Sequence, residues 1–406
     1  MPPDIQPARR SGFDLQIFAV MLAGTCTFLN VYCTQPLLPY LREIFHASEL
    51  QVSLTVSSAI FAVAITAPFI GLFAERHGRK KVIVPALFGV TVPTLLAATS
   101  TGLTSLIFWR FAQGLFVPGI IAVIIAYINE EWAGRGVGRV MAAYVTGTVI
   151  GGFLGRFISG IIATHFNWRA AFLVVGVLNL LGSFAVRTWL PKAQHFKPAE
   201  LSHAFADALE HLRNPRLLAV FALGFTVLFS IVGAFTYTNF YLAAPPFNLN
   251  TSQLGSIFFV YLIGVTITPV SGKFLDHYGF RRTAIVFCTL SISGLLLTLV
   301  RSLPVIVVGL AVFCAGIFIA QASATVQTGA IAGRARSSAA GLYVTLYYLG
   351  GSAGATVTGW FWLWRGWPGS IALLVAMSGL SLWLALLASR QPVAVRAKDA
   401  IVAPVD

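Results

Sequence analysis

Long apolar runs separated by short polar segments dominate the chain from residue 15 to residue 389. A helix that crosses the hydrocarbon core of a bilayer needs about 20 consecutive, mostly apolar residues. Each run of this length is predicted to form one membrane-spanning helix, which gives an all-α membrane protein with twelve spans. They cover 15–41, 50–74, 82–100, 104–128, 139–163, 168–190, 217–243, 252–275, 283–300, 304–328, 338–361 and 368–389.

Residues 191–216 interrupt this pattern, because prolines and charges replace the apolar residues there. The interruption divides the chain into an N-terminal tail (1–14), a six-helix bundle (15–190), a linker (191–216), a second six-helix bundle (217–389) and a C-terminal tail (390–406). Within the linker, Leu201, Phe205, Leu209 and Leu212 fall on one helical face. This spacing predicts a short amphipathic helix on the membrane surface.

The two bundles are related by internal repeats. Residues 71–81 (GLFAERHGRKK) align with residues 272–282 (GKFLDHYGFRR) at an offset of 201 residues. A glycine run in the fifth span, at 151, 152, 155 and 160, recurs in the eleventh span at 350, 351, 354 and 359. Such repeats predict two pseudo-symmetric halves with a substrate site between them, near the middle of the membrane.

Composition supports a membrane location, since 57% of the residues are hydrophobic and only 10% are charged. The formal net charge of +14 would suggest a polyanionic partner in a soluble protein. Most of the 27 Lys and Arg residues, however, fall in the segments on one side of the predicted spans. The positive-inside rule explains this bias and predicts that both termini are cytoplasmic, so no nucleic-acid partner is expected.

Two motifs carry a family resemblance. The loop after the second span matches the pattern G-x-x-x-D-R-x-G-R-R, with glutamate in place of aspartate, through Gly71, Glu75, Arg76, Gly78 and Arg79. The fourth span contains R-x-x-Q-G, beginning at Arg110 with the glutamine at Gln113. Over its whole length the chain thereby resembles the major facilitator superfamily. Its glycine run, which has Gly151-Gly152 where a Gly-Pro pair is usual, partly resembles the motif of the proton-driven exporters of this superfamily, and close helix packing is the alternative interpretation. Residues 341–362 resemble the YnfM-like exporters of the drug:proton antiporter branch.

The resemblance implies a monomeric secondary transporter that works by alternating access, in a bacterial inner membrane. It also implies that the repeated loop motifs act as gates on the cytoplasmic side. An acid and arginines beside a glycine turn can form a charge network that holds one closed state. Topology retention alone is the alternative role. The gating candidates are Gly71, Glu75, Arg76, Gly78 and Arg79, with Gly272, Asp276, Gly279, Arg281 and Arg282 in the second repeat.

Arg110 in the fourth span and Arg156 in the fifth are the intramembrane charges. An arginine at the centre of a span costs about 2.5–3.5 kcal/mol on insertion scales, so each should face a cavity or a partner. Binding to backbone carbonyls or snorkelling to the interface is the alternative. Further substrate-binding candidates are the polar and aromatic residues of other spans, which could instead form hydrogen bonds between helices. They are Asn30, Gln35, Gln113, Tyr237, Asn239, Gln321, Gln327, Tyr343, Tyr347 and Tyr348.

The acidic residues limit the mechanism. None of the 13 carboxylates lies in the middle of a predicted span, and Asp14, Glu130 and Glu131 near span ends are the nearest candidates for a proton site. A coupling proton would therefore bind there, travel on the substrate, or compete at the arginines. The same accounting predicts a positively charged central cavity, which favours an anionic or polar neutral substrate.

The sequence lacks the motifs that mark several other classes of protein. Neither a phosphate-binding G-x-x-x-x-G-K-[ST] loop nor an H-E-x-x-H metal motif occurs, so we expect no enzyme, no ATP hydrolysis, no metal and no cofactor. The leading hypothesis is proton-coupled efflux of a small organic compound across the lipid bilayer. Uptake or exchange of an organic anion or sugar is the second hypothesis, and a membrane sensor that does not transport is the third.

Overall fold

The computed structural model describes residues 10–133, 136–191, 210–332 and 336–389, and these residues are almost entirely helical. The first half contains α1 (Arg10–Val31), the 3₁₀ turn η2 (Gln35–Leu37), α2 (Leu38–Phe45), α3 (Glu49–His77), α4 (Lys80–Ala97), α5 (Leu103–Phe116), α6 (Pro118–Glu131), α7 (Val137–His165) and α8 (Trp168–Trp189). The second half contains α10 (Pro215–Ala243), α11 (Thr251–Ile257), the 3₁₀ segment η4 (Phe258–Leu262), α12 (Ile263–Leu297), α13 (Leu303–Ala332) and α14 (Arg336–Ala388).

Two continuous helical segments of the second half, α11 to α12 and α14, are long enough to cross a membrane twice. Within the described residues, ten helical segments have the length and hydropathy of membrane spans, and two of these contain 47 and 51 residues. A single crossing takes roughly 20 residues, so each of the two supplies a pair of spans. The chain reverses inside α12 at Gly279 (φ 75°) and inside α14 at Arg365 and Gly366. The predicted all-α fold with twelve spans is thereby confirmed.

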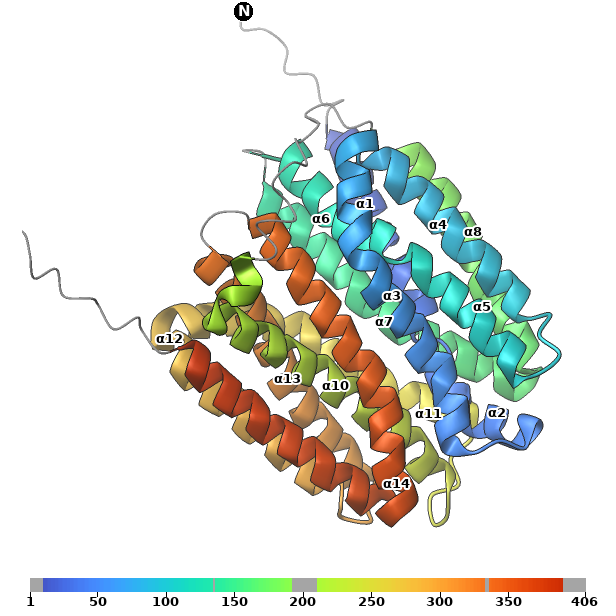
Figure 1. Ribbon diagram of the computed structural model, residues 1–406. Coiled ribbons are helices and arrows are strands. Elements are labelled where there is room, and N and C mark those ends of the chain that lie inside the picture. The colour runs from blue at the N-terminus through green and yellow to red at the C-terminus, as the bar shows by residue number, and fades with distance from the viewer. Residues whose placement is uncertain (1–9, 134–135, 192–209, 333–335, 390–406) are drawn as a thin grey trace, which may run out of the picture.

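The helices form two bundles that lie side by side (Figure 1). Helices α1 to α8 gather in one bundle, and α10 to α14 gather in the other. The turn glycines of the two repeated motifs, Gly78 and Gly279, have φ values of 95° and 75°, a region that side-chain-bearing residues rarely adopt. The repeat seen in the sequence therefore has the same backbone turn in both halves.

Glycines bring helices of each half into close contact. A Cβ atom added to Gly147, Gly151 or Gly155 of α7 would lie 2.1–2.2 Å from a backbone oxygen of α1. The second half repeats this contact, because a Cβ on Gly350 or Gly354 of α14 would lie 2.1–2.2 Å from a backbone oxygen of α10. Small residues at four-residue spacing let helix backbones approach closely in membranes. The glycine run is thus a packing feature of both halves.

Parts of three sequence predictions lie outside the described residues. The amphipathic helix predicted in the linker falls mostly within 192–209, which the description does not cover. Gly71 and Glu75 belong to α3, but their side-chain surroundings are also outside the described part. The same holds for both terminal tails, apart from the residues of α1 from Arg10 onward.

We expect Gly151→Ala to destabilise the protein by about 1–3 kcal/mol, because the new methyl group would overlap the Thr25 carbonyl oxygen. Gly138→Ala is the matched control, since it lies in the same helix and an added Cβ meets nothing within 4 Å. Thermal unfolding of the purified proteins in detergent, followed by tryptophan fluorescence, measures the difference. Equal midpoints for the two variants would contradict the packing role.

Candidate substrate site

The first membrane span is not one continuous helix. Helix α1 ends at Val31, and a turn leads into η2 at Gln35. Pro36 has no N–H group, and its ring excludes the α-helical position of the carbonyl four residues earlier. The Tyr32 carbonyl instead accepts from the Gln35 N–H at 3.1 Å, so this N–H is not available to the Val31 carbonyl at the end of α1. Water is scarce there, so side chains must supply the missing hydrogen bonds.

Arg110 of α5 supplies them from one side. Its Nη1 donates to the Asn30 carbonyl at 2.9 Å, its Nη2 donates to the Val31 carbonyl, and its Nε donates to the Thr55 carbonyl of α3 at 3.0 Å. The side chain is completely buried. Since these hydrogen bonds use all sides of the guanidinium, Arg110 fixes the end of α1 against α3 and α5.

Gln113 and Asn30 extend this network. Gln113 accepts a hydrogen bond from Arg110 and donates to Thr94 Oγ1 of α4 at 2.6 Å and to Asn30 Oδ1 at 3.2 Å. Thr94 also donates to Asn30 Oδ1 at 2.9 Å. Three of the predicted binding residues, Asn30, Arg110 and Gln113, are thus bonded to one another in the interior of the first half.

Arg156 of α7 contacts a different part of the same break. Its Nε donates to Gln35 Oε1 at 2.7 Å, and its Nη1 donates to the Gly152 carbonyl at 2.6 Å. The guanidinium carbon lies 4.5 Å from the ring centroids of Tyr32, Phe258 and Tyr261. Tyr32 follows α1, whereas the other two rings belong to η4 of the second half. Arg156 is therefore held at the contact between the halves.

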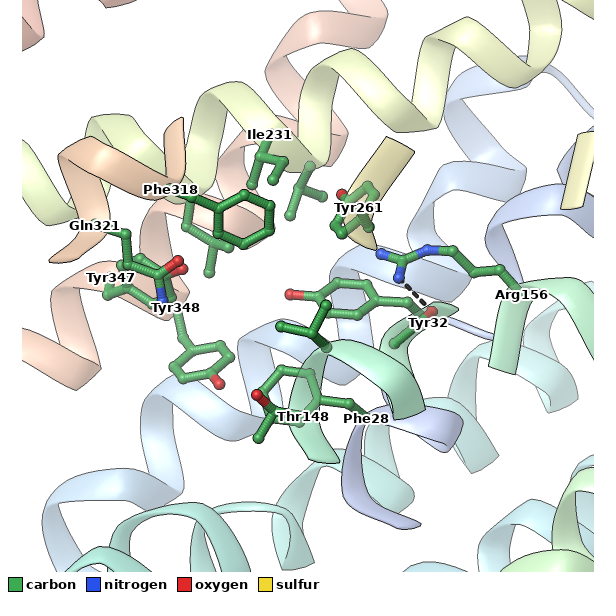
Figure 2. Close-up of a pocket in the computed structure, with 14 residues that line it drawn as sticks. Phe28, Tyr32, Thr148, Arg156, Ile231, Tyr261, Phe318, Gln321, Tyr347 and Tyr348 are labelled. Atoms are coloured by element: carbon green, nitrogen blue, oxygen red, sulfur yellow. Dashed lines mark hydrogen bonds between the residues drawn. The ribbon is translucent and has the colours of Figure 1, made fainter. Parts of the chain in front are cut away.

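A cavity of about 120 Å³ adjoins this guanidinium. Figure 2 shows Arg156 directed toward the space between Tyr32 and Tyr261, with Tyr347, Tyr348 and Gln321 on the far side. Both halves contribute to the wall, which consists of Phe28, Tyr32, Thr148, Val149, Gly152, Arg156, Leu228, Ile231, Val232, Tyr261, Phe318, Gln321, Tyr347 and Tyr348. The cavity is hence mostly apolar and aromatic, with one cation at its edge.

The cavity brings together only part of the predicted set. Arg156, Gln321, Tyr347 and Tyr348 line it. Gln35 lies behind this wall, where it accepts a hydrogen bond from Arg156. The remaining members form hydrogen bonds or packing contacts elsewhere: Tyr237 donates to the Ala355 carbonyl at 3.0 Å, Asn239 donates to the Phe235 carbonyl at 2.5 Å, and Tyr343 packs against Gly224.

Several wall residues have no distinctive signal in the sequence. Phe28, Phe318 and Leu228 are apolar residues of apolar spans, and nothing in the chain separates them from residues that face lipid. Tyr32 and Tyr261 are different, because each carries a hydroxyl group inside a span. A tyrosine hydroxyl within a predicted span is therefore the sequence signal that distinguishes both residues from the apolar wall.

Hydrogen bonds between the halves gather toward the end where α7 finishes and α11 begins. Thr164 and Thr251 place their hydroxyl oxygens 2.6 Å apart, and Thr251 also donates to the Gly160 carbonyl at 3.1 Å. Ser57 of α3 lies 2.9 Å from the hydroxyl oxygens of Ser352 and Thr356 of α14. We call this set the hydroxyl seal. It connects the two bundles toward this end.

The repeated charge motifs lie at the opposite end. In the first repeat, the Arg79 side chain is mostly buried. Its Nη2 and Nε donate hydrogen bonds to Glu130 Oε1 of α6, at 2.6 Å and 3.1 Å. Arginine–carboxylate pairs with two hydrogen bonds are strong and geometrically specific. Arg76 is exposed. In the second repeat, Asp276, Arg281 and Arg282 are exposed, and a Cβ on Gly272 would meet nothing within 4 Å.

A family model described as Major Facilitator Superfamily matches residues 20–355 and, in an overlapping second match, residues 231–405. The chain belongs to the major facilitator superfamily. It is therefore a multi-pass membrane transporter and not an enzyme. The inner membrane transport protein YnfM of Escherichia coli (strain K12) is 34% identical over 90% of this chain and 88% of its own length.

A further relative and a solved structure are also similar to this chain. The multidrug efflux protein YfmO of Bacillus subtilis (strain 168) is 25% identical over 84% of this chain and 85% of its own length. Among solved structures, a bacterial homologue of the human lysosomal transporter Spinster, inward-facing and occupied, superposes with a TM-score of 0.76 at 13% identity. That match covers 94% of this chain and 98% of the other, and it supports the fold.

We expect Arg110→Gln to lower the free energy of unfolding by at least about 2 kcal/mol, because buried carbonyls at Asn30 and Val31 lose their donors. The control is Arg42→Gln, which breaks an exposed 3.3 Å pair with Glu49 and should cost about 1 kcal/mol or less. Thermal unfolding in detergent compares the two. A midpoint for the Arg110 variant at or above that of the control would contradict the structural role.

Proposed function

We propose that this protein is a proton-linked exporter of a small organic compound, working as a monomer in a bacterial inner membrane by alternating access. The observation that carries the proposal is the cavity at Arg156, whose wall comes from both halves and which lies beside the hydroxyl seal that connects them. The bundles at 15–190 and 217–389 are the moving units. One chain supplies the complete site, so a second copy is unnecessary.

The distribution of charge supports an orientation. Arg79, Lys80, Arg281 and Arg282 lie at the end opposite the hydroxyl seal. The positive-inside rule assigns this basic end, and both termini with it, to the cytoplasm. The hydroxyl seal then faces outward and the cavity is loaded from the cytoplasm, as export requires. Resemblance to a protein named for multidrug efflux favours the same direction.

Glu130 is the proposed link to protons. The carboxylates of the described residues do not contribute to the cavity wall, whereas Glu130 holds Arg79 at the cytoplasmic end. A proton on Glu130 would neutralise the charge that attracts Arg79 and loosen the loop between α3 and α4. The exposed 3.5 Å pair between Asp14 and Arg139 is the weaker candidate, since solvent screens it.

Transport by the purified protein in proteoliposomes under an imposed pH gradient tests the proposal. A panel containing a cationic dye, a sugar and organic carboxylates should include a compound whose movement accelerates with the gradient. Glu130→Gln keeps the shape of the side chain and removes its charge, so transport should persist but lose most of its response to the gradient. Glu43→Gln, on the exposed surface of α2, should respond like the unmodified protein.

If the gradient response survives in Glu130→Gln, the proton site lies elsewhere. If no member of the panel responds to the gradient in the unmodified protein, proton-linked export is rejected for those compounds.

The hydroxyl seal must open for alternating access. The oxygens of Thr164 and Thr251 are 2.6 Å apart, so sulfur atoms placed there are close enough to form a disulfide. We expect the double variant Thr164→Cys/Thr251→Cys to lose at least tenfold in transport rate on oxidation and to recover it on reduction. Each single cysteine variant is the control. Unchanged transport by the cross-linked protein would show that this end does not open.

A further inference from the structure

We propose that the cavity binds a small organic monocarboxylate with a flat apolar body, and that Arg156 holds the carboxylate. The inference rests on the proposed function, because it names the substrate class of the same site. It is independent of the transport direction and of the residue that binds the proton.

Arg156 carries a positive charge that its protein partners do not neutralise. Only 1% of the residue is exposed, and the oxygens that it binds, on Gln35 and Gly152, are both neutral. Within the described residues, the salt bridges involve Arg42, Arg79 and Arg139 instead. A buried charge without a counter-charge is costly, and an anion entering the cavity would remove much of that cost.

The surroundings of the guanidinium favour a carboxylate. The rings of Tyr32, Phe258 and Tyr261 lie with their centroids 4.5 Å from the guanidinium carbon. These cation–π contacts stabilise the guanidinium group. Hydrogen bonds occupy Nε and one position on Nη1, so the Nη2 edge is left toward the cavity. Figure 2 shows the guanidinium directed into that space. Planar N–H edges bind carboxylates with two parallel hydrogen bonds.

The rest of the cavity sets the body of the ligand. Its volume of about 120 Å³ approaches the roughly 150 Å³ of an apolar cavity that binds benzene in another protein. Phe28, Ile231, Val232 and Phe318 supply apolar wall, whereas Gln321 adds a polar group opposite Arg156. One ring or a short branched chain fits this size, and a larger body requires the wall to move.

Charge excludes the competing classes. A single cation can neutralise one carboxylate, so a dianion would bring an uncompensated negative charge into the membrane interior. The positive charge of Arg156 would repel a cationic ligand at close range. The ammonium group of an amino acid would find no carboxylate on the wall. The site therefore distinguishes a monocarboxylate from its neutral amide and from an amine of equal size.

Binding of benzoate, benzamide, phthalate and benzylamine to the full-length protein in nanodiscs, measured by isothermal titration at pH 7 without a gradient, tests the inference. Benzoate should bind at least tenfold more tightly than each of the other three. Binding of benzamide or benzylamine as tight as that of benzoate overturns the proposal, as does the absence of benzoate binding. The ligand comparison uses the unmodified chain, so it does not depend on a variant that folds.

Variants then locate the site. Arg156→Gln should abolish benzoate binding, Arg156→Lys should retain a fraction of it, and Ile231→Trp should block it sterically while leaving Arg156 in place. Arg42→Gln at the surface should bind as the unmodified protein does. Unaltered benzoate binding in a folded Arg156→Gln or Ile231→Trp protein places the anion elsewhere and overturns the assignment.

The outcome also separates this inference from the proposed function. Benzoate binding without gradient-driven movement of any panel compound in proteoliposomes would reject proton-linked export for those compounds and leave the anion site standing. Gradient-driven movement of the dye or sugar, with no benzoate binding, would reject the anion site and leave the exporter standing.

Discussion

The unpaired carbonyl groups at the end of α1 are the constraint on which the site depends. Pro36 prevents the helix from continuing. The carbonyl groups left without helical partners must then find donors in a region without bulk water. Arg110 binds two of these carbonyls, and Ser159 of α7 donates to the Cys33 carbonyl at 2.6 Å. The break is thereby rigid, and it positions Tyr32 and Gln35 against Arg156.

The two halves share their packing, but three charged residues of the first half have no charged counterpart in the second. Glycines of α7 and α14 press against α1 and α10 in the same way. Arg79, Glu130 and Arg156, however, correspond to Phe280, Gly329 and Ala355 at the repeat offsets. The first half therefore holds the charge networks and the cavity cation, whereas the second contributes rings, apolar wall and the hydroxyl groups of Ser352 and Thr356. The two halves therefore have the same fold but contribute different groups to the site.

The apolar periods and the repeat were sufficient to predict the helices, the twelve spans and the two halves, because lipid imposes length and composition on every span. The site was predictable only where a residue was costly in lipid. Arg156 met that criterion and lines the cavity. Arg110 met it too, yet it binds carbonyls freed by a helix break that hydropathy does not reveal. The apolar wall had no such signal, since its residues resemble those that face lipid.

The uncompensated charge of Arg156 has an electrical consequence. A carrier that reverses its open side changes the part of the membrane field that acts on its site, and moving one elementary charge through 100 mV is worth about 2.3 kcal/mol. With the basic end in the cytoplasm, a negative interior would hold the empty carrier with its cation accessible from inside. A bound monoanion would cancel that charge. The loaded carrier would then reorient almost independently of voltage, whereas the return of the empty carrier would respond to it.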